Sequence, residues 1–451
     1  MGRKLIAIHS SLLFDPQKKE FVKNVSITID CAQGAISDVY VRKSDDEIGR
    51  NDIDLRGKVV MPGFVDSHTH VFLHSYSERS STEQMRDESI IERTVRATNH
   101  VREALLSGYT TYRDLGTEAM QNFDANLRDC INRGLIPGPR LFVATHALAS
   151  TSSYAIRSES QQSGLVLPRA SDADDGPVGV RRAVRRRVGD GADIIKFYAD
   201  YRRKIQRFPQ LPPHVKGQSI EFPPANPNPQ VPLFSQEEMD AIVAEARLSE
   251  LPVAAHAGSA KAALMAARAG VTSVEHGQDS TDEVFAEMVK QGTIFVPTLA
   301  VFAHLAKGDL PRILGRTKRA YDMGVRLAAG GDTGAFPHGE GVREMELMRE
   351  AGIPIEDVLE ACMVAGWEAC GGDQCGFRFG WFEKGSRADI IALDADPRED
   401  ARALRKVSFV MKDGRVWKRD GRPIGMLAEH KWPDAEEPET KSEDSSGWTA
   451  V

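Results

Sequence analysis

Two histidines one residue apart, His68 and His70, follow an apolar run in PGFVDSHTH. Alternate residues of a strand point to the same face, so both imidazoles can reach one metal ion. A chain of 451 residues with 12 histidines contains such a pair by chance roughly 0.3 times, so the pair is a weak signal alone. A metal site requires further ligands elsewhere in the chain.

Three further polar residues stand near the ends of apolar runs. His256 occurs in AAHAG, His276 in VEHGQ and Asp332 in AAGGDT. Imidazole nitrogens and a carboxylate suit Zn²⁺ and similar transition metals. A single buried histidine is usually explained by a backbone partner, but the repetition at four predicted strand ends favours one shared metal site.

Lys196 stands among apolar residues in GADIIKFYADY. Removing an ammonium from water costs several kcal/mol unless it is paired, deprotonated or chemically converted. Two divalent ions need more negative charge than Asp332 supplies, and a carbamate formed from this lysine and CO₂ would be an anionic bridging ligand. The alternatives are a side chain that extends its ammonium to the rim, or one paired with Asp193 or Asp200.

These residues need a scaffold that brings strand ends together. Apolar strand, polar loop and amphipathic helix alternate from residue 59 to about residue 370. The predicted helices carry termination signals, such as the capping box of Ser235 and Glu238. Eight β-α units favour an α/β fold of the (β/α)8 TIM-barrel type, with its active site at the carboxyl ends of the strands. The predicted strands are 59–66, 108–114, 140–148, 192–200, 252–258, 272–278, 293–299 and 325–333.

The two ends of the chain have a different pattern. Residues 1–58 alternate in short strand-like runs, and strand character returns over 376–425, where Asp413-Gly414 is a strong hairpin signal. We expect these segments to form one small composite β-sandwich beside a barrel over 59–375. Within the barrel, the proline-rich segment 202–233 is predicted to be a lid insertion. The acidic tail, 435–451, is predicted to be disordered.

Composition excludes several classes of function. The formal net charge is -7, and the basic run RRAVRRR is interpreted as a solvated helix face, so we expect a small-molecule substrate and no nucleic-acid partner. No segment approaches the roughly 20 apolar residues of a membrane helix. The five cysteines form no C-x-x-C pair, which fits a reducing compartment, and the cytoplasm is the expected location. Association into a homo-oligomer stays open.

Taken together, the motifs resemble the amidohydrolase superfamily. They are PGFVDSHTH, the lysine of the fourth strand, AAHAG, VEHG, GGDT and the closing GWFEKGSRADIIALD. The closer likeness is to the binuclear branch related to imidazolonepropionase, prolidase-like carboxypeptidases and fungal ochratoxinase. The resemblance implies a distorted (β/α)8 barrel with a composite terminal β-sandwich.

The resemblance also implies a role for each ligand. His68 and His70 hold the alpha metal ion, and His256 and His276 hold the beta ion. Carbamylated Lys196 bridges two divalent ions, expected to be Zn²⁺. Asp332 completes the alpha site and transfers the proton.

The implied reaction is metal-dependent hydrolysis of an amide-type C–N bond in a small molecule, such as an N-acyl amino acid, a dipeptide or a mycotoxin-like amide. Two ions share a water whose pKa falls toward neutrality. Asp332 accepts its proton and then protonates the leaving amine. Hydrolysis of a cyclic amide, lactone or ester, or deamination, remains an alternative on the same site. A metal-free scaffold on the same barrel is a further alternative.

Three departures from the closer relatives fall around the substrate. Gly258 stands where those relatives have a polar residue, Tyr154 stands near an expected histidine, and YADYRRK replaces a small turn after the lysine. Arg202 or Arg203 is a candidate partner for a substrate carboxylate. The other candidates for contact with the substrate are His146, Tyr154, Tyr198, Tyr201 and His338.

Overall fold

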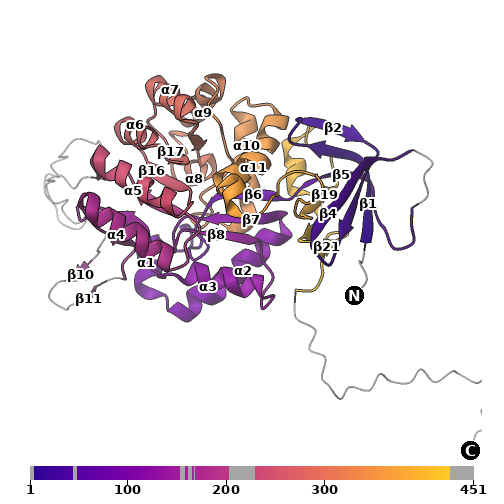
Figure 1. The fold of residues 1–451 in the computed structure, drawn as a ribbon, viewed down its shortest axis with the longest axis horizontal. Helices are drawn as coiled ribbons and strands as arrows, with labels where there is room; N and C mark the ends of the chain where they lie inside the picture. The colour runs from indigo at the N-terminus through magenta and orange to yellow at the C-terminus, as the bar shows by residue number, and fades with distance from the viewer. Residues whose placement is uncertain are drawn as a thin grey trace, which may run out of the picture.

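A computed structural model describes residues 5–43, 48–152, 158–160, 165–166, 168–202 and 229–426. A helix-covered barrel and a separate β-sheet lie next to each other (Figure 1). Tyr154, Arg203, most of the predicted lid and the predicted disordered tail lie outside the described residues. Within the described ranges, no helix combines the length and the apolar character needed to span a bilayer.

Parallel strands form the barrel, as predicted. The third position around the barrel is shared by two short strands, because β8 pairs with β7 and β9 pairs with β13. The eighth position is held by residues 326–333, which close the ring through the bridges Phe295–Leu327 and Thr69–Thr333. The regular strands are β6 (Phe64–Thr69), β7 (Tyr109–Asp114), β8 (Arg140–Val143), β9 (Ala147–Ala149), β13 (Ile195–Tyr198), β16 (Val253–Ala257), β17 (Ser273–His276) and β18 (Ile294–Val296).

Three predicted strands differ from those observed. The run 59–66 is divided at Gly63, because β5 (Ile53–Pro62) pairs within the terminal sheet and only β6 enters the barrel. A continuous apolar run does not show which of two sheets each part joins. The run 140–148 is interrupted at Thr145, whose φ is 59°. The run 325–333 forms isolated bridges rather than a regular strand.

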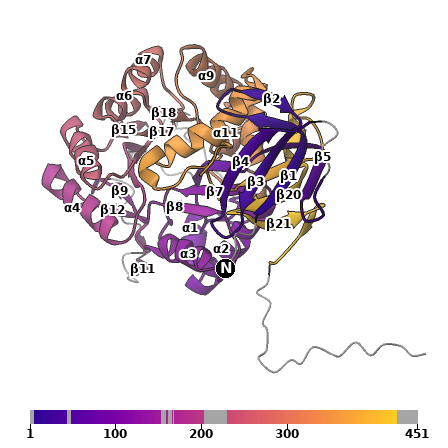
Figure 2. The same ribbon diagram turned by 45° about the vertical axis from the view of Figure 1, so that its right-hand side comes forward.

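Helices surround the barrel (Figures 1 and 2). Their apolar faces pack against the strands in one large core. The capping box predicted at Ser235 and Glu238 is present, and Gly292 ends α7 at a φ of 70°. The α-helices are α1 (Ser81–Asp87), α2 (Ile90–Leu106), α3 (Phe123–Asn132), α4 (Gly176–Gly189), α5 (Gln236–Leu248), α6 (Ala260–Ala269), α7 (Asp282–Gln291), α8 (Leu299–Leu305), α9 (Leu310–Asp322), α10 (Val342–Glu350) and α11 (Ile355–Ala369). Short 3-10 turns are η1 (His338–Glu340), η2 (Gly372–Cys375) and η3 (Ala401–Arg405).

The two ends of the chain together form a separate β-domain, as predicted, and its strands belong to one composite sheet (Figure 2). Strand β19 pairs with β5 and so joins the C-terminal strands to the N-terminal ones. The sheet has its own apolar core, which includes Ile27, Val60 and Phe409. Asp413 and Gly414 form the predicted turn, with φ of 50° and 72°. Its other strands are β1 (Leu5–Asp15), β2 (Glu20–Lys23), β3 (Val25–Asp30), β4 (Ala35–Val41), β19 (Ile390–Leu393), β20 (Val407–Lys412), β21 (Arg415–Arg419) and β22 (Arg422–Pro423).

Short strands accompany the loops at the barrel mouth. β10 (Ser158–Ser160) pairs with β11 (Leu165–Val166), and β12 (Ser171–Ala173) extends the sheet beside β9. β14 (Asp200–Arg202) pairs with β15 (Gln230–Pro232) in antiparallel register. This pairing brings together the two ends of the predicted lid.

Candidate metal centre

The histidines at the ends of β6, β16 and β17 meet at the barrel mouth. The ring centroids are 4.9 Å apart for His68 and His276, 5.4 Å for His68 and His70, and 4.6 Å for His256 and His276. Asp332 Oδ1 lies 3.6 Å from His68 Nε2 and 3.4 Å from His70 Nε2. In the described part of the chain, one group of possible ligands has all its donor atoms within 4.8 Å, namely His68, His276 and Asp332.

Lys196 lies on β13, the strand next to β16, and is only 2% exposed. Burial lowers the pKa of this amine to about 8, although Glu275 and Asp332 oppose that change. Such a small exposure excludes a side chain that extends its ammonium to the rim. A buried amine with a lowered pKa is neutral in part near neutral pH.

The two acids considered as partners of Lys196 are engaged elsewhere. Asp193 pairs with Arg128, with 2.7 Å between Oδ2 and Nη1. Asp200 accepts hydrogen bonds from the backbone N–H groups of Gly258 and Ser259, at 2.9 and 2.6 Å. Neither acid therefore pairs with Lys196. Lys196 also forms no salt bridge with any other carboxylate in the described ranges.

Burial holds three of the four imidazoles of the centre in the neutral form. Burial is the main cause that lowers the pKa of His68, His256 and His276, and the charge of Lys196 adds to it at each. The pKa of His256 falls to about 3, and Arg202 is among the charges that contribute. Neutral imidazole is the form that binds transition metals.

Hydrogen bonds orient these rings from outside the centre. His68 Nδ1–H donates to Glu275 Oε2 at 2.8 Å, and Glu275 is fully buried. His70 Nδ1–H donates to the Gly116 carbonyl at 2.8 Å. His68 Nε2 is buried and has no hydrogen-bond partner. That orphaned lone pair, among nitrogen and carboxylate donors, fits a divalent metal ion.

A second layer of buried charge fixes Glu275. Its Oε1 accepts from Arg113 Nη1 at 3.2 Å and from Ser273 Oγ at 2.5 Å. Arg113 is fully buried and also donates to the Ser67 carbonyl at 2.9 Å. The carboxylate therefore keeps one orientation and holds the proton of His68 on Nδ1.

The backbone is strained at two predicted ligands and at Thr298, which is hydrogen-bonded to His276. His276, Thr298 and Asp332 have φ of 71°, 51° and 63°, a left-handed region that residues other than glycine rarely adopt. A Cβ on Gly330 would lie 2.6 Å from the backbone nitrogen of His68, so glycine permits the close approach. Strain of this kind is concentrated at functional sites.

Asp66 ties the first and last strands together. Its Oδ1 accepts from the backbone N–H groups of His68 at 3.1 Å and Gly331 at 3.2 Å. Its Oδ2 accepts from Thr333 Oγ1 at 3.1 Å. Burial raises the pKa of Asp66 to about 7, and these hydrogen bonds oppose the rise.

Glu275, Arg113 and Asp66 are functional residues that were not predicted from the sequence. Each is a charged residue within an otherwise apolar strand, in TSVEHGQ, TTYRD and PGFVD. That signal was available, because an ionisable side chain is almost never fully buried without a partner. It did not reveal which partner each would have.

Two of the predicted substrate residues lie beside the metal centre. The ring of Tyr198 is 4.9 Å from that of His256, and its hydroxyl donates to Glu118 Oε1 at 3.3 Å. The ring of Tyr201 is 6.0 Å from that of Tyr198. His146 instead accepts a hydrogen bond from Arg187 of α4 at 2.9 Å.

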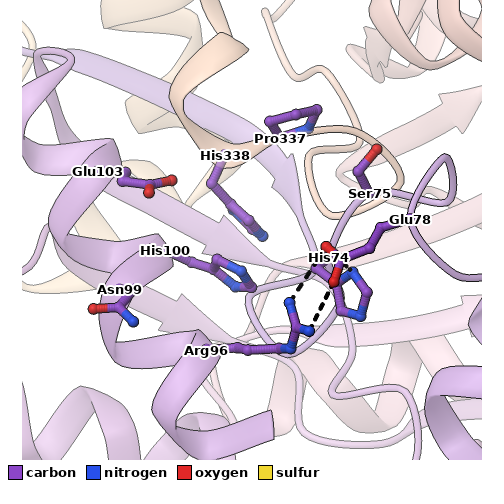
Figure 3. Close-up of a pocket in the computed structure, with 9 residues that line it drawn as sticks. All are labelled: His74, Ser75, Glu78, Arg96, Asn99, His100, Glu103, Pro337 and His338. Atoms are coloured by element: carbon purple, nitrogen blue, oxygen red, sulfur yellow. Dashed lines mark hydrogen bonds and ion pairs between the residues drawn. The ribbon is translucent and has the colours of Figure 1, made fainter. Parts of the chain in front are cut away.

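His338 lines a different cavity (Figure 3). It is 1% exposed, stacks on His100 at 4.3 Å and donates from Nε2 to the Leu73 carbonyl at 3.0 Å. The cavity has a volume of about 280 Å³ and lies between α2 and the loops after β6 and after residue 333. None of the six predicted ligands lines it.

Comparison with known proteins shows similar chains. The chain matches the model of the Amidohydrolase family over residues 59–417. Ochratoxinase from Aspergillus niger is 28% identical over 405 residues, which covers 81% of this chain and 77% of that protein. Imidazolonepropionase from Caldanaerobacter subterraneus subsp. tengcongensis is 24% identical over 403 residues, covering 84% of this chain and 86% of that protein.

Solved structures have the same architecture. A crystal structure of a Xaa-Pro dipeptidase with bound methionine in its active site has a TM-score of 0.73 and 28% identity, covering 92% of this chain and 100% of the other. The crystal structure of A. niger ochratoxinase has a TM-score of 0.73 and 25% identity, covering 93% and 96%. The family match includes the whole barrel and all six predicted ligands. The chain therefore belongs to the amidohydrolase family and is a hydrolase that acts on carbon–nitrogen bonds.

Proposed function

We propose that this enzyme is a binuclear metal-dependent hydrolase that cleaves an amide-type C–N bond in a small molecule. The supporting observation is the convergence of four imidazoles and the Asp332 carboxylate at the barrel mouth. The charge of the buried Lys196 acts on the histidines of this group from β13. His68, His70 and Asp332 would hold one ion, and His256 and His276 the other. Nitrogen and oxygen donors of this kind favour Zn²⁺.

Lys196 is proposed to carry a carbamate that bridges the two ions. With a pKa of about 8, about one tenth of the amine is neutral at pH 7, and only the neutral amine attacks CO₂. The reaction forms one N–C bond and releases one proton. It replaces an unpaired buried cation with an anion, which supplies the negative charge that two divalent ions require.

Asp332 is proposed to carry the proton. When bound, the ions supply Lewis acidity and lower the pKa of water, so that a nucleophile forms near neutral pH. Burial raises the pKa of Asp332, and the charges of His70 and Lys196 oppose this change. A carboxylate in this position can accept the proton from the attacking water and deliver it to the leaving amine.

The substrate is proposed to be a small molecule such as an N-acyl amino acid, a dipeptide or a mycotoxin-like amide. Ochratoxinase and the Xaa-Pro dipeptidase among the similar proteins support this choice. We place the enzyme in the cytoplasm, since the five cysteines, all within the described residues, form no disulfide.

Two measurements test the proposed function. Elemental analysis of protein purified without chelators is expected to find about two divalent ions per chain. A panel of acyl amino acids, dipeptides, lactones, esters and amidines, assayed for the acid formed and for released amine, alcohol or ammonia, is expected to show hydrolysis of linear amides. Ammonia release from amidines would instead identify a deaminase, and the absence of divalent metal from protein purified without chelators would reject the proposal.

A further inference from the structure

The amide of Gln230 occupies the space beside Gly258. A Cβ on Gly258 would lie 2.3 Å from Gln230 Nε2 and 2.7 Å from Gln230 Oε1. Gly258 follows the strand end that carries His256, so this amide lies beside a residue two positions after that predicted ligand. A polar group from strand β15 therefore stands where the side chain of residue 258 would otherwise extend.

Arg202 extends from the same face of the hairpin. It stands directly opposite Gln230 in the antiparallel pairing of β14 and β15. Directly opposed residues on antiparallel strands share a face. Because the amide of Gln230 reaches Gly258, the guanidinium extends toward the same side, and its charge acts on His256. Arg202 makes no ion pair with any residue in the described ranges.

The hairpin is fixed to the barrel at this point. The Leu233 N–H donates to the Ala199 carbonyl at 2.9 Å. Asp200, at the start of β14, accepts a hydrogen bond from the Gly258 N–H at 2.9 Å. It also accepts hydrogen bonds from the N–H and the hydroxyl of Ser259, both at 2.6 Å. Both oxygens of Asp200 are thus occupied by donors, and its carboxylate anchors β14 to the end of β16.

We propose that Gln230 and Arg202 are specificity-determining residues that bind a carboxylate of the substrate beside His256. The inference rests on the proposed amide hydrolysis. A guanidinium and an amide N–H on one face can donate to the two oxygens of a carboxylate. The hairpin thereby replaces the polar group that residue 258 lacks, and amides that bear a carboxylate bind better than their neutral counterparts.

A matched pair of probes tests this site. Binding of N-acetyl-L-phenylalanine and of its C-terminal amide to the zinc-loaded protein is measured by calorimetry. The wild-type protein is expected to bind the acid at least about tenfold more tightly. Arg202→Met and Gln230→Ala are each expected to weaken binding of the acid by about tenfold and to leave binding of the amide unchanged. Arg56→Met, which changes an exposed arginine of the terminal sheet, is the control and alters neither.

Gly258→Ala tests the contact between the hairpin and the strand. The new methyl group displaces the flexible end of Gln230, so binding of the acid is expected to weaken in the wild-type background. In a Gln230→Ala background the same change is expected to have no further effect. Additive effects of the two changes would overturn the role of Gln230.

Release of phenylalanine is measured separately, so that this inference and the proposed function can fail independently. Equal binding of acid and amide by the wild-type protein, or binding of neither, overturns the carboxylate site even if amides are hydrolysed. A preference for the acid that disappears in Arg202→Met supports the site even if neither probe is cleaved.

Discussion

At the scale of single residues, the candidate metal centre depends on groups that are not among its predicted ligands. Glu275 holds the proton of His68 on Nδ1, so Nε2 presents its lone pair to the mouth. Arg113 and Ser273 hold Glu275 in turn. Removing such an outer partner typically costs 10–100-fold in metal affinity.

We therefore predict that Glu275→Gln lowers zinc affinity by roughly 10–100-fold, because the neutral amide holds the His68 proton less firmly. Competition with a chromogenic chelator measures the change. Glu283→Gln, on the exposed side of α7, is the matched control and should retain wild-type affinity. Equal affinities in both variants would show that Glu275 does not position His68.

A second prediction concerns Lys196 in metal-free protein. Its pKa is about 8 when folded and near 10.5 when unfolded. Between these values the unfolded state binds more protons, so the free energy of unfolding rises with pH. The wild-type protein should gain roughly 3 kcal/mol relative to Lys196→Met between pH 8 and pH 10.5. Urea unfolding of the two apo proteins across this range measures the difference, and parallel pH profiles would contradict the lowered pKa.

Single residues were predictable where their types repeat at strand ends. His68, His256 and Asp332 each follow an apolar run. Alternation along a strand also brings His68 and His70 to one face. The interaction of Arg113 with Glu275 joins positions 162 residues apart. Neither residue type nor spacing encodes that partnership, so it became visible only in three dimensions.

At the scale of elements, the eighth position of the barrel shows how backbone geometry brings ligands together. Gly330 lets residues 326–333 approach the backbone of His68, and Asp332 then leaves the barrel at a positive φ. The sequence predicted a regular strand here. It could not show the bridges that replace it, because a pair of glycines does not specify how closely two backbones approach.

Gly330→Ala is predicted to disrupt this approach, since its Cβ would meet the His68 nitrogen at 2.6 Å. The opposing atom is backbone and cannot move without displacing the H-T-H segment, so we expect loss of metal binding and reduced stability. Gly315→Ala places the same methyl group in open space within α9. That control should stabilise the protein by about 0.5–1 kcal/mol. Thermal unfolding and metal content of the two variants are measured. Full metal occupancy in Gly330→Ala would show that metal binding does not require the close approach at residue 330.

At the scale of the whole molecule, one buried arginine joins the barrel to the terminal sheet. Arg140, at the start of β8, donates to Asp389 Oδ2 at 2.8 Å and to Asp413 Oδ1 at 2.6 Å. Arg140 is 6% exposed and Asp389 is 2% exposed. The predicted turn at Asp413 therefore also fixes how the composite sheet meets the barrel.

Arg140→Met is predicted to lower the free energy of unfolding by roughly 3–5 kcal/mol, because Asp389 would keep a buried charge without its partner. Chemical denaturation measures the loss. Arg56→Met removes an exposed pair with Asp54 and should change stability by less than about 1 kcal/mol. Equal effects of the two substitutions would mean that Arg140 is not the joint between the two parts.

The overall architecture was predictable because the alternation of strand and helix persists over most of the chain. The division at Gly63 was not, since Val59 to Asp66 reads as one apolar run although two sheets share it. Arg202 and Gln230 show the same limit, because they are 28 positions apart and their proximity depends on the register of β14 and β15.

The most direct test is a crystal structure of the zinc-loaded protein, grown with bicarbonate and measured at the zinc absorption edge. Two anomalous peaks are expected at the barrel mouth, with planar density extending from the Lys196 nitrogen between them. A free amine at residue 196, with no peak beside the six side chains, would contradict it.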